Sequence, residues 1–160
     1  MTVDPRTPVL IGCGQVNHRD EIDPKTRSIE PVDLMAAAAR QAADSRVIEA
    51  VDSIRVVNVL SARYRDPGLL LGERIGATNF RTLYSPVGGN VPQSLVNQAC
   101  LDIQRGRAGV VLLAGAETWR TRRGLKAKGG KLEWTVQDES VPMAEVTGDE
   151  VPMFGDAELK

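Results

Sequence analysis

The sequence predicts an α/β fold built on a largely parallel sheet with helices on both of its faces. Short apolar runs rich in β-branched residues alternate along the chain with segments whose apolar residues recur at helical spacing. The last of these runs, residues 109–115, is apolar without alternation, as expected of a central strand covered on both faces. Strand and helix patterns that alternate in this way favour parallel strands joined by helical crossovers.

The first two elements are a strand and an alanine-rich helix. Gly12 and Gly14 lie within the first apolar stretch and indicate close packing against another backbone. Pro31 suits the first position of a helix, and the alanines that follow favour its continuation. In chain order, the predicted strands are 8–16, 54–60, 80–84 and 109–115, and the predicted helices are 31–43, 66–76 and 91–105.

The later elements have clear boundaries. Asp66 and Pro67 form an N-cap and first-position pair for the second helix, and Gly76 suits its end. The third strand, 80–84, is closed by Ser85 and Pro86. The third helix has an apolar face and stops before a glycine; that face comprises Val91, Leu95, Ala99 and Ile103.

Composition excludes several classes of protein. The 160 residues carry a formal net charge of −1 and few aromatic side chains, so nothing in them favours binding to nucleic acid. No apolar run approaches the ~20 residues that cross a bilayer, and the N-terminal residues lack the pattern of a signal peptide. We expect a cytoplasmic protein that binds neither nucleic acid nor membrane.

Few residues have the chemistry of a catalytic or metal site. Cys13 and Cys100 lie far apart and form no metal-type pair, so we expect two reduced, buried thiols. His18 is the only histidine, and its polar surroundings favour a solvated loop residue. No metal is predicted, and no residue is assigned a catalytic role.

The best candidate site is the turn Gly88, Gly89 and Asn90, between the third strand and the third helix. In α/β folds, ligands gather at the carboxyl ends of strands. A turn that enters a helix there directs backbone N–H groups toward a ligand, and glycines allow the ligand to approach closely. Geometry alone leaves an ordinary tight turn equally open.

The chain changes character after Glu117. Residues 119–131 are basic, whereas residues 132–160 are rich in acids and have poor periodicity. A basic run can bind phosphates, although such a run is more often a solvated face. The candidate phosphate-binding residues are Arg120, Arg122, Arg123 and Lys126.

Two linked segments carry a resemblance to a known family. Residues 87–106 contain the glycine turn and its helix, and residues 108–118 end in Ala114-Gly-Ala-Glu-Thr118. Together with the opening strand 8–16, they resemble the N-terminal half of the thiolase superfamily. In that family, a strand, a turn bearing the nucleophilic cysteine, a buried helix and a strand ending in Ala-Gly-Gly-x-Glu-Ser follow one another.

The sequence departs from that pattern at the nucleophile. Counting back from Glu117 without gaps places the family's cysteine position at Gly89, followed by Asn90, Val91 and Pro92. Cys100 cannot replace it, because it lies about three helical turns further along. Without a thiolate, no acyl-enzyme is expected.

The resemblance implies a domain division and a ligand. Residues 1–118 would form the thiolase-like α/β domain, and residues 119–160 the poorly regular start of the family's loop domain. The first unit would then be incomplete at its C-terminus, and the expected protein partner is a second copy of the chain or the missing C-terminal half. The implied ligand is acyl-CoA, a thioester that is bound as substrate or ligand, with no other cofactor.

The resemblance therefore implies an acyl-CoA-handling protein of the acyltransferase family, of the acetyl-CoA acetyltransferase or thiolase type, with Gly89 at the nucleophile position. We expect the chain to be a portion of a longer protein. A non-catalytic module that binds acyl-CoA or a partner is the alternative.

Overall fold

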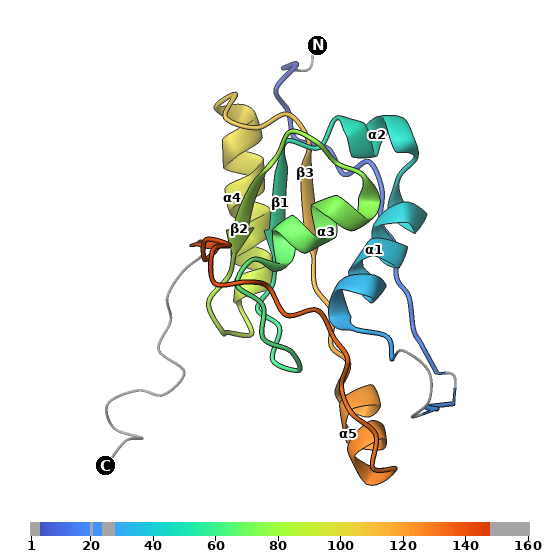
Figure 1. The fold of residues 1–160 in the computed structure, drawn as a ribbon. Helices are drawn as coiled ribbons and strands as arrows, with labels where there is room; N and C mark the ends of the chain where they lie inside the picture. The colour runs from blue at the N-terminus through green and yellow to red at the C-terminus, as the bar shows by residue number, and fades with distance from the viewer. Residues whose placement is uncertain (1–3, 20, 24–27, 148–160) are drawn as a thin grey trace, which may run out of the picture.

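The computed structural model describes residues 4–19, 21–23 and 28–147. Within them, four parallel strands form one sheet in the order β3-β1-β2-β4, with helices packed on it (Figure 1). The elements in chain order are α1 (Pro31–Ala42), α2 (Ser45–Glu49), β1 (Ser53–Val56), α3 (Pro67–Ile75), β2 (Arg81–Tyr84), α4 (Val91–Gln104), β3 (Val111–Ala114), α5 (Trp119–Ala127) and β4 (Glu145–Val146). The predicted α/β class with a parallel sheet is confirmed.

Side-chain alternation along β1 shows which helices cover each face of the sheet. Ile54 and Val56 are fully buried in the core that α1 and α3 complete, where Leu71 of α3 is also fully buried. Arg55 points to the opposite face, because successive side chains of a strand alternate. There it donates to Asp102 of α4 at 2.5 Å. Helices α1 and α3 therefore lie on one face and α4 on the other.

The predicted helix boundaries rest on capping groups. Glu30 and Asp33 form a reciprocal capping box around Pro31 at the start of α1. Asp66 accepts a hydrogen bond from Leu69 N at the start of α3. Gly76 ends α3 with a φ of 81°, in the left-handed region that glycine adopts without strain.

The predicted strand over 8–16 is wrong. These residues pair with no strand among those described, although their close packing is confirmed. A Cβ atom at Gly12 would overlap the carbonyl oxygen of Ala42, and one at Gly14 would overlap that of Ala38. The segment therefore packs on the backbone of α1. A groove of about 330 Å³ separates it from β3, and Leu10 is left 87% exposed.

The expectation that residues 109–115 form a central strand is also wrong. Val111–Ala114 form β3 at the edge of the described sheet, and all four residues are only half-buried. Its apolar composition is typical of a central strand whose two faces are covered by helices. Within the described residues, however, it forms backbone hydrogen bonds with one neighbouring strand only, β1. Cys13, expected to be buried, is exposed beside this edge, and Cys100 is half-buried; both thiols are free.

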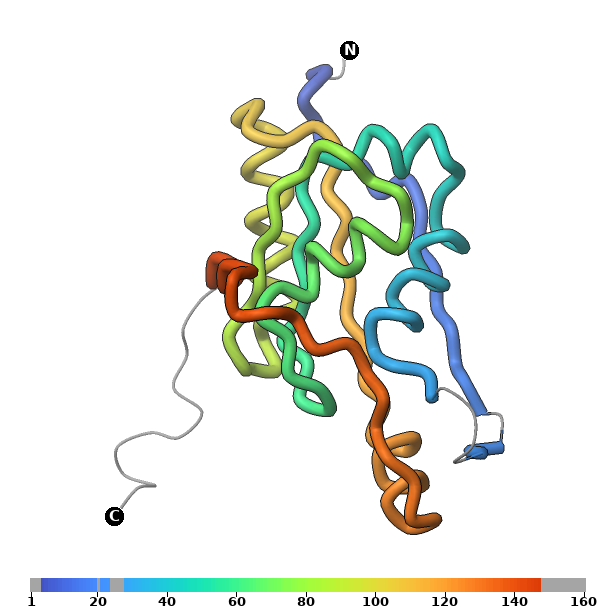
Figure 2. The backbone as a smooth tube through the Cα atoms, in the orientation of Figure 1, coloured from blue at the N-terminus to red at the C-terminus, as the bar shows by residue number. Residues whose placement is uncertain are grey.

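The chain after α5 turns back and packs on the first part of the molecule (Figure 2). The indole Nε1 of Trp134 donates to Ser28 Oγ at 2.9 Å, and Thr135 N donates to Glu30 Oε2 at 3.0 Å. Strand β4 then joins the sheet beside β2. The sequence predicted neither α5 nor β4, and the domain division at residue 118 stays a prediction.

Candidate functional site

The loops that follow β1, β2 and β3 lie at the same end of the sheet, where the carboxyl ends of the strands meet, because these strands are parallel and in register. Glu117, beyond β3, joins two of these loops: its Oε1 accepts from Leu60 N at 2.7 Å and its Oε2 from Ser61 N at 2.8 Å. Ser61 Oγ in turn accepts from Thr118 N at 2.9 Å. The carboxylate that the sequence motif highlighted therefore holds the loop after β1 in place.

A second set of contacts joins the loops after β1 and β2. Ser85 Oγ accepts from Asn58 N at 2.8 Å, and Asn58 Nδ2 donates to Ser85 O at 3.2 Å. The hydroxyl oxygen of Tyr84 accepts from Val59 N at 2.8 Å. Burial raises the pKa of Tyr84 above its ordinary value, so its phenol stays protonated at neutral pH. These contacts hold the loop after β1 against the end of β2 and the residue that follows it.

The glycine turn is open at Gly89, the position at which the family resemblance places the nucleophilic cysteine. Gly89 is exposed, and a Cβ atom added there would meet no other atom within 4 Å. At Gly88, a Cβ atom would lie 3.0 Å from both Asn90 Oδ1 and Val91 Cγ2. Asn90 is the N-cap of α4, and its carbonyl oxygen accepts from the backbone of the first turn. A side chain at Gly89 is thus excluded by neither space nor backbone conformation.

The four predicted basic residues lie on α5, but their environments differ. Arg122 Nη1 donates to Ser61 O at 2.9 Å, and its guanidinium carbon lies 5.6 Å from the centroid of the Trp119 ring. The guanidinium carbon of Arg123 lies 5.9 Å from the same centroid. Arg123 and Lys126 are exposed, and Arg120 reaches a cavity. Arg122 thus has a structural contact that the sequence did not indicate.

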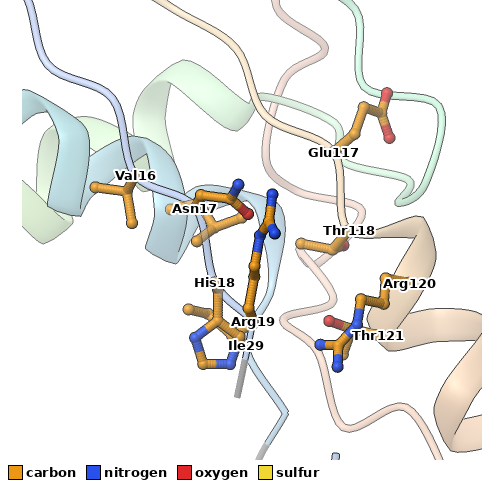
Figure 3. A pocket seen from close by; sticks show the side chains of 10 residues that line it. Val16, Asn17, His18, Arg19, Ile29, Glu117, Thr118, Arg120 and Thr121 are labelled. Atoms are coloured by element: carbon orange, nitrogen blue, oxygen red, sulfur yellow. The ribbon is translucent and has the colours of Figure 1, made fainter. Parts of the chain in front are cut away.

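That cavity has a volume of about 550 Å³ and opens beside the start of α5 (Figure 3). Its walls come from three parts of the chain: residues 16–19, the segment that leads into the first turn of α1, and the start of α5 with the two residues before it. The lining residues are Val16, Asn17, His18, Arg19, Ile29, Leu34, Glu117, Thr118, Arg120 and Thr121.

Sequence reasoning selected only one of the three basic side chains that line this cavity as a candidate site residue. Arg120 belongs to the predicted set, whereas Arg19 was not singled out and His18 was interpreted as a solvated loop residue. The structure places His18, half-buried, in the cavity wall. No local pattern joins residues 16–19 to the start of α5, so only the folded chain reveals the cavity. The glycine turn does not line it.

No group of three or more His, Cys, Asp or Glu side chains that could hold a metal ion occurs among the residues that the structure describes. None of the helices described is long and apolar enough to span a membrane.

Comparison with known proteins identifies the fold. The chain is similar to the crystal structure of a monomeric SCP2-thiolase-like protein type 1 from Mycobacterium smegmatis, with 30% sequence identity and a TM-score of 0.61. The match covers 74% of this chain but only 25% of that protein, so the chain spans about a quarter of its relative's length. No protein-family model and no curated protein matches the chain. The sheet, its flanking helices and this likeness together show that the chain has a thiolase-like α/β fold.

Proposed function

We propose that this chain handles acyl-CoA in the manner of a thiolase-like protein, binding the thioester without forming a covalent acyl-enzyme. The observation that carries the proposal is the likeness in fold to an SCP2-thiolase-like protein over 74% of the chain. The glycine turn at the end of β2 supports it, because this turn stands where the family resemblance puts the reactive centre.

The absence of covalent catalysis follows from the residue at that centre. Gly89 has no side chain to attack a thioester, and Cys100 lies deep in α4. Glu117 accepts two backbone hydrogen bonds and is held against the loop after β1. What the turn offers a thioester is backbone: N–H groups at the entry of α4 can polarise a carbonyl oxygen. This favours the non-catalytic binding module over the acyltransferase.

A cysteine introduced at Gly89 tests the location of the site. In a Cys13→Ser background, Gly89→Cys should react with an alkylating acyl-CoA analogue at least tenfold faster than with an untargeted alkylating agent of equal reactivity, since a bound analogue raises the local concentration of its reactive group. Labelling is read by mass spectrometry. The Cys13→Ser background removes the exposed native thiol.

Asn97→Cys, on the exposed surface of α4, is the matched control and should show no such preference. Equal preference at both positions, or no preference at residue 89, would rule out an acyl-CoA site at the turn. The basic residues of α5 are tested through Arg123→Ala, because Arg122→Ala would also remove the contact with Ser61. Unchanged CoA affinity would exclude Arg123 as a phosphate contact.

A further inference from the structure

Three arginines gather around one carboxylate near the amino end of the sheet, away from the glycine turn that follows β2 (Figure 1). Ser53 of β1 pairs with Arg81 of β2, so Arg55 and Arg81 point to the same face of the sheet. Asp102 of α4 meets them there: its Oδ2 lies 2.5 Å from Arg55 Nη2 and 3.4 Å from Arg81 Nη2. Beyond the end of α4, Arg107 donates to Asp102 Oδ1 through Nε at 2.8 Å and lies 2.6 Å from it through Nη2. We call these three arginines and Asp102 the arginine cluster.

The charges in the arginine cluster do not balance. Three guanidinium groups share the single negative charge of Asp102, which leaves two positive charges in excess. The carbonyl end of α4 offsets about half of one charge. Asp52, just before β1, forms no ion pair with an arginine among the described residues; its Oδ2 accepts from Gly109 N at 2.7 Å instead. The cluster therefore keeps a positive potential.

Two of the three guanidinium groups in the cluster reach the surface. The side chain of Arg55 is fully buried, and its Nη1 has no hydrogen-bond partner among the described residues. The side chains of Arg81 and Arg107 are 49% and 53% exposed. Within the described part of the chain, the Asp102 carboxylate is the one group to which either of these two side chains donates. Both therefore have further N–H groups that can donate to a second anion.

A phosphate group matches this arrangement. Guanidinium groups bind phosphate oxygens with charge-assisted hydrogen bonds, and a phosphate has enough acceptor oxygens to bridge two of them. At neutral pH, a phosphate monoester carries a charge of about −1.5 to −2, close to the excess in the cluster. We propose that Arg81 and Arg107 bind a phosphate group, either the free ion or a small monoester. Asp102 orients both guanidinium groups, and the buried Arg55 adds its charge. This site does not rest on the proposed function.

Titration of the full chain with inorganic phosphate and with methyl phosphate tests the site, at an ionic strength held constant with sodium chloride. The Nε–Hε signals of Arg81 and Arg107 in NMR spectra should shift and saturate. Arg81→Gln, followed through the Arg107 signal, should weaken the binding at least tenfold, the loss typical of a charge-assisted contact. This variant should keep its fold, because Arg55 and Arg107 still pair with Asp102.

Arg105→Gln is the matched control, because Arg105 is exposed at the end of α4 and forms no ion pair among the described residues. It removes the same charge and should leave the affinity unchanged. Saturation by only one of the two ligands would support the site and identify its ligand as the free ion or the monoester. Wild-type affinity in Arg81→Gln, an equal loss in Arg105→Gln, or the same shifts with sodium chloride alone would overturn the proposal.

Discussion

The absence of a side chain has different consequences at Gly89 and at Gly12. At Gly89 the turn is open, and nothing lies within 4 Å of an added Cβ atom. The missing side chain there removes a possible nucleophile and has no effect on packing. At Gly12 the missing side chain is what lets the N-terminal segment lie against the backbone of α1.

Alanine substitution should separate the two glycines. Gly12→Ala should lower the free energy of unfolding by about 2 kcal/mol, because its Cβ atom would overlap the Ala42 carbonyl oxygen and force the segment away from α1. Gly89→Ala should change it by less than about 0.5 kcal/mol. Urea denaturation followed by circular dichroism measures both. Equal effects would show that the N-terminal segment does not pack on α1 in solution.

At the scale of elements, buried charges join parts of the molecule that the sequence keeps apart. Glu30, fully buried, accepts from Arg74 of α3 at 2.6 Å and from Tyr64 at 2.9 Å. It also accepts from both the N–H and the hydroxyl of Thr135. Burial, together with the hydrogen bond to Glu30, raises the pKa of Tyr64 far above its ordinary value, so its hydroxyl remains a donor. One carboxylate thus holds α1, α3 and the returning chain together.

Glu30→Gln should weaken the attachment of the segment around Thr135 more than it destabilises the rest of the fold. The amide keeps the shape of the carboxylate but replaces one acceptor oxygen by a donor, which then faces either the donors of Arg74 and the Thr135 hydroxyl or those of Tyr64 and the Thr135 N–H. Hydrogen exchange of the Thr135 amide should become at least tenfold faster, while exchange in β1 changes less. Glu49→Gln, exposed on α2, is the control. Unchanged exchange at Thr135 would show that Glu30 does not hold this segment.

At the scale of the whole molecule, paired carboxylates make the stability of the fold depend on pH. Asp102 lies among Arg55, Arg81 and Arg107, with contacts of 2.5, 3.4 and 2.6 Å. Burial alone would raise the pKa of Asp102, but the hydrogen bonds from Arg55 and Arg107 outweigh it and lower this pKa. A carboxyl group with a lowered folded-state pKa stabilises the fold above its unfolded pKa, about 3.9 for Asp.

That contribution is lost as the pH falls below about 4 toward the folded-state pKa. The free energy of unfolding should therefore drop between pH 6 and pH 3, as measured by urea denaturation at each pH. Asp102→Asn should be less stable at pH 6 by about 3 kcal/mol, because it leaves the buried Arg55 without its counter-charge. It should also lose less stability on acidification. An equal loss in both proteins would exclude Asp102 as an origin of the acid sensitivity.

Local sequence signals predicted the elements whose boundaries rest on local chemistry. Pro31, the Asp66 cap and Gly76 each act on their own helix, so α1 and α3 lie where the sequence placed them. Helix α4 follows from apolar periodicity, and the three longer strands follow from short apolar runs rich in β-branched residues. The same signals did not predict β4, because a two-residue strand exists only through its pairing with β2.

The sequence by itself determined the α/β class, the order of its main elements and the glycine at the centre of the proposed site. Each of these depends on a few neighbouring residues or on a motif that is contiguous in the sequence. The tertiary structure alone decided that residues 8–16 pack on a helix, that β3 is an edge strand and that Arg19 and Arg120 share a cavity. The physical reason is that pairing, burial and convergence of charges are properties of contacts between distant segments, which no local pattern encodes.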